Sequence, residues 1–309
     1  MIRPLFIPPG ARRAAAARAL PVLALCSLAA LGCSGKKRKA APPAEPPPTA
    51  IDTLVVHKVA ADVSKPDPAA AYWQGLAEGE IVMTAQPMVA PRPDVATTEK
   101  VFVKAVTDGK LAAFRIRWRD PERSMAGRLG EFSDALALEF PVKTDPLPPV
   151  MMGAAGAPVH IFHWRAQYQR DHEEGKPTIA TLYPNASIDM YPMEFKDQPG
   201  AHEAGREQFS PGAAVGNPQS YAKGGVDEII AEGYSTSSVQ AGSEGHAAHG
   251  DWANGEWTLV IVRPLATEGG SNLAPGQRAF IAFAAWQGGK LEVGSRKCVT
   301  MAWLPVSVQ

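Results

Sequence analysis

Cysteine is scarce in this chain, with only three residues among 309. Cys26 lies within an N-terminal apolar run and Cys33 follows that run, so Cys298 is the single cysteine of the remaining sequence. The main part of the chain therefore has no pair of cysteines for an internal disulfide. It also has no Cys-x-x-Cys-His motif, which excludes covalent attachment of a c-type haem by the usual signature.

The N-terminal apolar run, residues 19–31, is too short to cross a bilayer comfortably, and four arginines precede it. This arrangement is typical of an export signal. Small and apolar residues lead into Cys33, and this ending resembles the lipobox of bacterial lipoproteins. We expect residues 1–32 to be a lipoprotein-type signal peptide and Cys33 to carry a lipid anchor on the periplasmic side of a bacterial membrane. Because Ala30 stands where leucine is usual, ordinary signal cleavage remains an alternative.

The segment after the signal, residues 33–50, is basic and rich in proline, so we expect an extended tether. The whole chain lacks net charge, because 31 basic residues balance 31 acidic ones. Eight of the basic residues and one of the acidic residues lie in residues 1–50, which leaves 23 and 30 in the remainder and a net charge of about −7. An acidic body argues against a nucleic-acid partner.

Residues 51–309 have the alternation of β-strands. Asp108-Gly109 separates two alternating runs, and the second places Phe114 and Trp118 on one face and Arg115 on the other, which predicts a hairpin. The fold class we expect is all-β, an antiparallel β-sandwich of two packed sheets with few short helices, such as 226–231, and with long loops over about 167–223. Further strands are expected at 80–87, 134–142, 159–164, 256–265, 278–286 and 297–303.

A series of sequence blocks between Trp73 and Leu304 includes "MMGAAGAPVHIFHWRA" at 151–166 and "SRKCVTMAWLP" at 295–305. Their content and order resemble the haem b-binding gamma subunits of ethylbenzene dehydrogenase and of related molybdenum enzymes of the dimethyl sulfoxide reductase type. The resemblance implies two packed antiparallel sheets and a b-type haem with one methionine and one lysine as axial ligands. By motif position these ligands map to Met152, which directly precedes a glycine, and to Lys297.

From the residues alone, both positions also have ordinary interpretations. Methionine fills gaps in cores, so Met151 and Met152 could simply pack, and a strand lysine is usually exposed. Lys290 is the rival lysine, but it follows two glycines in an expected turn. Strand alternation places Cys298 on the face opposite Lys297, where it would be a small buried hydrophobe.

Histidines are the commonest metal ligands and need separate consideration. His160 and His163 should face opposite sides of one strand, so they cannot easily share a metal. His246 and His249, beside Asp251, could bind zinc, but a solvated loop explains them better. We find no Ser-His-Asp or Cys-His arrangement, and Asp120 with Glu122 lies in a turn signal, so no catalytic function is expected.

A haem with both axial positions filled by protein can pass single electrons but has no open site for substrate. The expected function is therefore electron transfer by a periplasmic cytochrome, either with iron-sulfur and molybdenum oxidoreductase subunits or another cytochrome as partners, or as a tethered standalone protein. The alternative is an exported carbohydrate-binding β-sandwich without haem, whose sugar-stacking tryptophans would be Trp73, Trp252 and Trp286.

Overall fold

The computed structural model of the chain describes residues 46–125, 127–185, 225–240 and 246–309. The chain divides into two compact units, and the second, Pro43–Gln309, contains all of these residues. Cys33, the signal segment and most of the tether lie outside the described residues, so their assignments remain predictions. Within the described ranges, no helix has the length and apolar character needed to cross a membrane.

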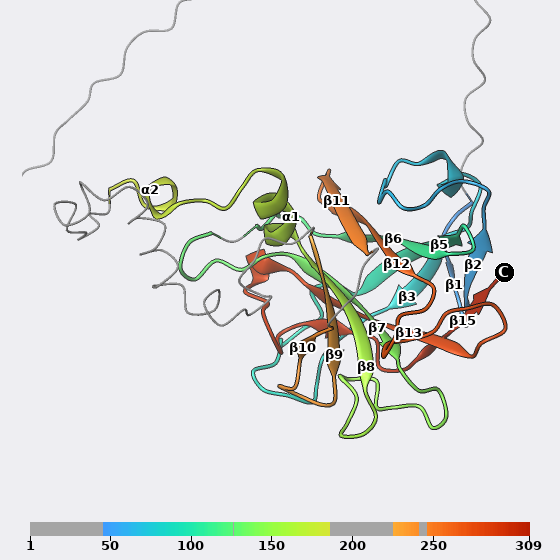
Figure 1. Cartoon of the computed structure of the whole chain (residues 1–309). Coiled ribbons are helices and arrows are strands. Elements are labelled where there is room, and N and C mark those ends of the chain that lie inside the picture. The colour runs from blue at the N-terminus through green and yellow to red at the C-terminus, as the bar shows by residue number, and fades with distance from the viewer. Residues whose placement is uncertain (1–45, 126, 186–224, 241–245) are drawn as a thin grey trace, which may run out of the picture. The chain divides into compact units, whose positions relative to one another are not determined.

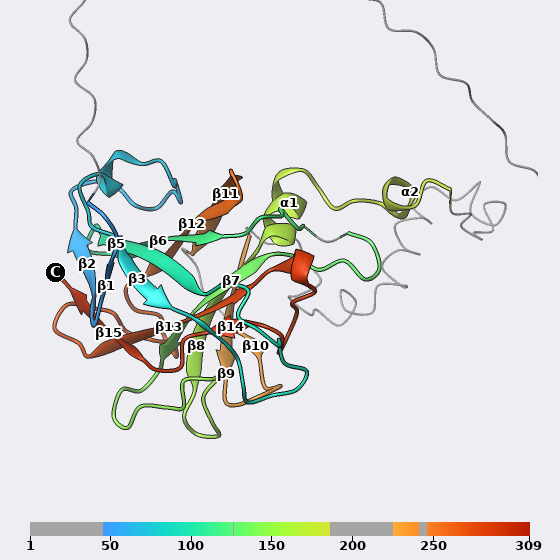
Figure 2. The same cartoon turned by 180° about the vertical axis from the view of Figure 1, so that it is seen from behind.

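Strands dominate the described residues, so the all-β prediction is confirmed (Figures 1 and 2). The helices are α1 (Ala166–Glu173), α2 (Ile179–Leu182) and the 3-10 helices η1 (Ala71–Trp73) and η3 (Gly288–Lys290). The strands are β1 (Thr49–Ala50), β2 (Leu54–Lys58), β3 (Gly79–Val82), β4 (Thr84–Ala85), β5 (Lys100–Thr107), β6 (Leu111–Arg119), β7 (Ala135–Pro141), β8 (Val159–Arg165), β9 (Val226–Ala231), β10 (Ser238–Val239), β11 (Ala247–Ala253), β12 (Glu256–Pro264), β13 (Ala279–Trp286), β14 (Cys298–Val299) and β15 (Leu304–Val308).

The prediction of two packed antiparallel sheets is not confirmed by the pairing of the strands. They follow one hydrogen-bonded path in the order β10-β9-β8-β7-β13-β15-β2-β5-β6-β12-β11. The strand β13 joins the two halves of this path, because Ala279–Ile281 pair with β15 whereas Ala282–Trp286 pair with β7. The pairing is also not wholly antiparallel, since β2 runs parallel to both β5 and β15, and β1 runs parallel to β3.

The β5–β6 hairpin forms where Asp108-Gly109 predicts it. Gly109 has a φ of 99°, a value that costs glycine little, and the Asp108 carboxylate accepts hydrogen bonds from the backbone N–H groups of Lys110 and Leu111 at 2.8 Å each. The turn fixes the register of the two strands, and this register buries Phe114 while Arg115 faces outward.

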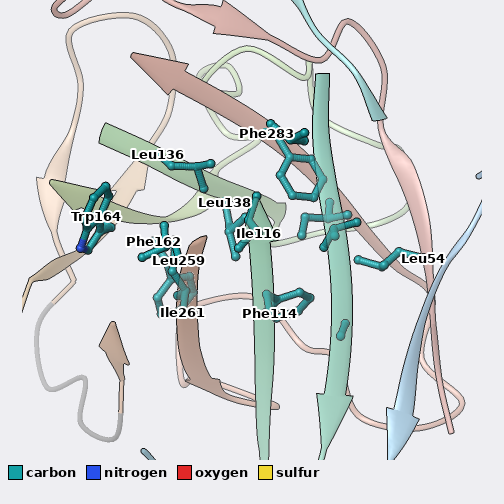
Figure 3. Packing of buried hydrophobic residues seen from close by; sticks show 14 of the residues in the cluster. Leu54, Phe114, Ile116, Leu136, Leu138, Phe162, Trp164, Leu259, Ile261 and Phe283 are labelled. Atoms are coloured by element: carbon teal, nitrogen blue, oxygen red, sulfur yellow. The ribbon is translucent and has the colours of Figure 1, made fainter. Parts of the chain in front are cut away.

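The main hydrophobic core lies between the two halves of the strand path, as Figure 3 shows for residues from β6, β7, β8 and β12. Phe114 of β6 lies 5.8 Å from Phe140 of β7, and Trp164 of β8 lies 5.0 Å from Trp257 of β12, measured between ring centroids. Such aromatic pairs are worth about 0.5–1.5 kcal/mol beyond the burial of their area. Face-to-face packing therefore closes the fold even though the sheet is continuous.

Two local predictions are wrong. Residues 226–231 form strand β9, not a helix, and the segment expected to be loop from residue 167 contains α1 and α2. The helix α1 follows β8 directly and contacts β8 and β11. The rest of that segment, residues 186–224, lies outside the described residues.

Candidate functional site

A cavity of about 700 Å³ lies against the face of β7, β8, β9 and β13 that points away from the main core. Strand alternation produces this wall, because Phe162 and Trp164 of β8 point into the core while Ile161, His163 and Arg165 line the cavity. The lining consists of Gln86, Val89, Ala137, Glu139, Met151, Met152, Ile161, His163, Arg165, Ile229, Tyr234, Ser235, Ser237, Ser238, Val239, Ala284, Trp286, Gly294, Ser295 and Lys297.

Small residues at the centre of the wall make room for the cavity. Ala137 of β7 pairs with His163 of β8 on one side and with Ala284 of β13 on the other, so three adjacent strands contribute to one row. Because the side chains of paired residues point to the same face, the two alanines leave a shallow floor between larger neighbours. A larger side chain at either position would fill this floor.

Met152 enters the cavity from the connection between β7 and β8, and its backbone is unusual. It has a φ of 63°, which is uncommon for a residue other than glycine. Its N–H donates to Oε1 of Glu139 at 3.1 Å, and its carbonyl accepts from the N–H of Gly233 at 2.7 Å. The side chain of Glu139 in β7 and the backbone of Gly233, which follows β9, therefore hold this uncommon conformation, and such conformations cluster at functional sites.

Lys297 reaches the same cavity from the residue before β14. Its Nζ lies 5.0 Å from the ring centroid of Trp286, and its carbonyl accepts from the N–H of Gln86 at 3.0 Å. The next residue, Cys298, is fully buried on the main-core side with its Sγ near Thr97 and Thr98. The opposite orientation predicted for Lys297 and Cys298 is therefore confirmed, and Cys298 is a free, buried thiol.

Glu139 lies between the two predicted ligands. Burial raises the pKa of its carboxyl to about 8, while Lys297 and the Met152 N–H oppose this shift. Burial likewise lowers the pKa of Lys297, and the charge of Glu139 opposes that shift. Both directions favour the neutral forms, because the cavity wall penalises charge on either group.

His163 is the histidine of the cavity wall. Its ring centroid lies 4.9 Å from that of Trp286, and its Nε2 is buried without a hydrogen-bond partner among the described residues. Burial holds its pKa well below the ordinary value, with smaller effects in the same direction from Arg165 and Lys297. The imidazole is therefore neutral at physiological pH.

The cavity brings together Met152 and Lys297, the two residues that the family resemblance implies as axial ligands. It separates them from Lys290, which is exposed at the end of η3 and does not line it. Met151 lines the same cavity, so the geometry does not by itself choose between the two methionines. The ligand assignment therefore remains a prediction.

His160 and His249 make their contacts outside the cavity. His160 faces away from the cavity, as predicted, and its Nε2 lies 2.6 Å from Glu228 in the interior. His249 belongs to strand β11, not to a loop, and contacts Glu173 and Asp251 at its ring nitrogens. In the part of the chain that the structure describes, no group of three or more histidine, cysteine or acidic side chains is arranged to hold a metal ion.

The tryptophans proposed as sugar platforms are not exposed. Trp73 is 3% exposed and Trp286 is 7% exposed, while Trp252 is partly buried and donates its Nε1–H to the Asp120 carbonyl. A stacking platform needs an open ring face. This finding removes the structural basis that we gave for the carbohydrate-binding alternative.

Sequence reasoning did not identify Glu139, Arg165 or Trp286 as parts of the site. Arg165 lies just beyond the strand expected at 159–164, and nothing in the sequence indicated that this region borders a cavity. Asp120 was treated as a turn residue, yet it is 1% exposed and faces the buried Asp134.

Comparison with known proteins shows the family of this chain. The sequence model of the family described as "Ethylbenzene dehydrogenase" matches residues 70–298, which span most of the described body. The chain belongs to this family. Both Met152 and Lys297 lie inside the matched region.

Curated relatives cover most of the chain. A Haloferax mediterranei protein named "Putative respiratory nitrate reductase heme subunit ORF7" is 23% identical over 92% of this chain and 81% of its own length. The dimethylsulfide dehydrogenase subunit gamma of Rhodovulum sulfidophilum is 24% identical over 77% and 73%, and the chlorate reductase subunit gamma of Ideonella dechloratans is 25% identical over 76% and 77%. These names describe subunits of oxidoreductases.

A solved structure, titled as a "putative carbohydrate-binding protein" from Bacteroides uniformis, covers 83% of this chain and 99% of its own at 11% identity. The TM-score of 0.42 is too low for this likeness to carry an argument about fold or function.

Proposed function

We propose that this chain binds a b-type haem in the cavity described above and passes single electrons as a non-catalytic subunit or partner of a molybdenum oxidoreductase. The observation that carries the proposal is that Met152 and Lys297, more than a hundred residues apart in sequence, line one cavity. The names of the relatives, which include a haem subunit and two gamma subunits, point in the same direction.

The residues present fit a large, flat, mostly apolar cofactor. A volume of about 700 Å³ lies within the roughly 300–1,000 Å³ usual for cofactor pockets. The alanines of the floor and the aliphatic side chains Ile161 and Ile229 suit a macrocycle. The Nε2 of His163, buried without a hydrogen bond, indicates a polar contact that the described part of the chain does not supply.

The ligand chemistry fits the environment. A thioether is a neutral, soft ligand that favours ferrous iron, and an amine binds only when it is deprotonated. The lowered pKa of Lys297 agrees with such a role. A haem held by protein on both sides supplies reversible one-electron transfer without an open position for substrate, which is why we propose no catalysis.

The proposed partners are iron-sulfur and molybdenum subunits, or another cytochrome. The expected signal peptide and lipidation at Cys33 would place the protein on the periplasmic side of a bacterial membrane. A tether is not obviously needed in a soluble complex, so a standalone, membrane-tethered cytochrome is the variant of this proposal that the N-terminal sequence favours.

A single spectrum tests the proposal. We expect the full chain, purified after expression with sufficient haem, to have a Soret band and, on reduction, the α and β bands of a low-spin b-type haem. Acid-acetone should extract the haem, because no Cys-x-x-Cys-His motif attaches it covalently. A chain that stays colourless and does not take up added haemin would refute haem binding, and binding of polysaccharide by that colourless chain would favour the alternative.

A further inference from the structure

Arg165 is the cavity's second basic side chain. It is the last residue of β8 and lines the cavity on the same face as His163, while α1 begins at the next residue. Arg165 pairs across the strands with Ala135, and Ala135 pairs with Trp286. These three residues form the row next to the row of His163 and Ala137. Arg165 is only partly exposed.

The guanidinium is held in place but has no acidic partner. Its Nη1 donates to the Tyr168 hydroxyl at 2.9 Å, and its central carbon lies 4.8 Å from the Tyr168 ring centroid. Among the described residues, no salt bridge joins Arg165 to a carboxylate, although Asp227, the cross-strand partner of His163, is buried close enough for its charge to act on Tyr168. By contrast, Arg117 pairs with Glu78 and Glu256 on the outer face of the other half of the strand path.

The neighbouring position on the strand also lacks a partner. The Nε2 of His163, two residues earlier on the same face, is buried with no hydrogen bond. Buried polar atoms in native proteins almost always find a partner, and a cation on a cavity wall without an acid favours an anionic ligand. Among the described residues, Arg165 has no ion pair and the Nε2 of His163 has no hydrogen bond, so this end of the cavity can accept a carboxylate ligand.

We propose that Arg165, positioned by Tyr168, binds a propionate carboxylate of the haem. This inference rests on the proposed function and assigns the orientation of the cofactor, with one propionate directed toward the C-terminal end of β8. A guanidinium suits this task because its planar donors match a carboxylate, and Tyr168 fixes its direction before the ligand arrives. Glu139, the acidic residue of the cavity lining, lies on the other side of the His163 row, away from Arg165.

The test compares haemin with its dimethyl ester, which has the same iron and macrocycle but no carboxylate. We expect the full chain to bind haemin about ten- to a hundredfold more tightly than the ester, the range of one charge-assisted hydrogen bond. In Arg165→Gln we expect most of this preference to disappear, and in Arg165→Lys we expect part of it to remain. Arg278→Gln, at an exposed arginine over Phe280, is the matched control and should keep the full preference.

Three outcomes of this experiment would overturn a proposal, and they can be told apart. Binding of both ligands by the wild-type chain with equal affinity overturns the role of Arg165 but leaves haem binding intact. Retention of the full preference by Arg165→Gln overturns it too, provided that the low-spin spectrum shows the axial ligands unchanged. Failure of the wild-type chain to bind either ligand overturns the proposed function and this inference together.

Discussion

Met152, a proposed axial ligand, has an uncommon backbone conformation. Its backbone has the left-handed conformation that glycine usually adopts, and for another residue this conformation costs of order 1–3 kcal/mol of stability. Hydrogen bonds to Glu139 and from Gly233 offset that cost and fix the direction of the side chain. A residue that merely fills a gap needs no such backbone, so this geometry favours the functional interpretation over simple packing.

The two proposed axial ligands can be removed separately. We expect Met152→Ala and Lys297→Ala each to abolish the six-coordinate low-spin spectrum or to shift the reduction potential strongly, because each removes one ligand from the iron. Absorption spectroscopy and redox titration of the haem-loaded variants check this.

Matched controls lie beside each ligand. Met151→Ala should leave the spectrum intact and lower stability by less than the roughly 2–5 kcal/mol of a fully buried methionine, since Met151 is only partly buried. Lys290→Ala, at an exposed position outside the cavity, should change neither property. A spectrum that responds to Met151 and not to Met152 would show that the methionine assignment is wrong although haem is bound.

For single residues of the site, the sequence was informative only where the family resemblance implied what a residue does. Met152 and Lys297 came from motif position, whereas Glu139 and Arg165 needed the structure. Which face of a strand borders a cavity depends on segments that approach from elsewhere in the chain.

At the scale of elements, local patterns worked where local chemistry dominates. The β5–β6 hairpin follows from Asp108-Gly109, because the turn itself dictates the pairing. In contrast, β9 has apolar residues at 226, 229 and 230, a spacing that also fits a helix. Pairing with β8 and β10 makes it a strand, and this tertiary effect cannot be read from six residues.

Two buried carboxyl groups lie close together, that of Asp120 directly after β6 and that of Asp134 directly before β7. Burial raises the pKa of Asp134 as well, but its carboxylate accepts from the N–H groups of Ser124 and Gly288 and from Nε1 of Trp257, which stabilise its charged form. Burial, followed by the charge of Asp134, raises the pKa of Asp120 to about 8. Asp120 is therefore protonated at neutral pH and becomes a destabilising second charge when it ionises.

This pair predicts a pH dependence of stability. Because the pKa of Asp120 in the folded state is above its unfolded value of 3.8, its stabilising effect is complete below about pH 4 and is lost as the pH rises through about 8. We expect Asp120→Asn, which cannot ionise, to gain in melting temperature relative to wild type as the pH increases from 5 to 9.

Thermal unfolding across that pH range measures the effect. Asp94→Asn, at an exposed aspartate, is the control and should track the wild-type curve. If Asp120→Asn and wild type keep a constant difference from pH 5 to 9, the raised pKa of Asp120 is contradicted.

For the whole molecule, the fold class was predictable but the connection between its halves was not. Many short strands with turn residues between them predicted an all-β body. The continuity through β13 depends on one strand changing partners from β15 to β7 along its length, and no feature of the sequence "AFIAFAAW" marks the change. The cavity lies on the face of the β7–β9 half that points away from the core.

The last prediction concerns how the molecule is held in the cell. If residues 1–32 are removed and Cys33 is acylated, the basic, proline-rich tether would leave the haem domain free to reach partners near a membrane surface. We expect Cys33→Ser to move the protein from the membrane fraction to the soluble periplasmic fraction, while Cys26→Ser, inside the expected signal peptide, should leave it membrane-bound. Fractions should be washed at high salt, because the four consecutive basic residues after Cys33 can bind anionic lipids without any acyl chain, and salt screens that attraction. Persistent membrane association of Cys33→Ser after this wash would contradict the lipid anchor and favour ordinary signal cleavage with attachment through a partner.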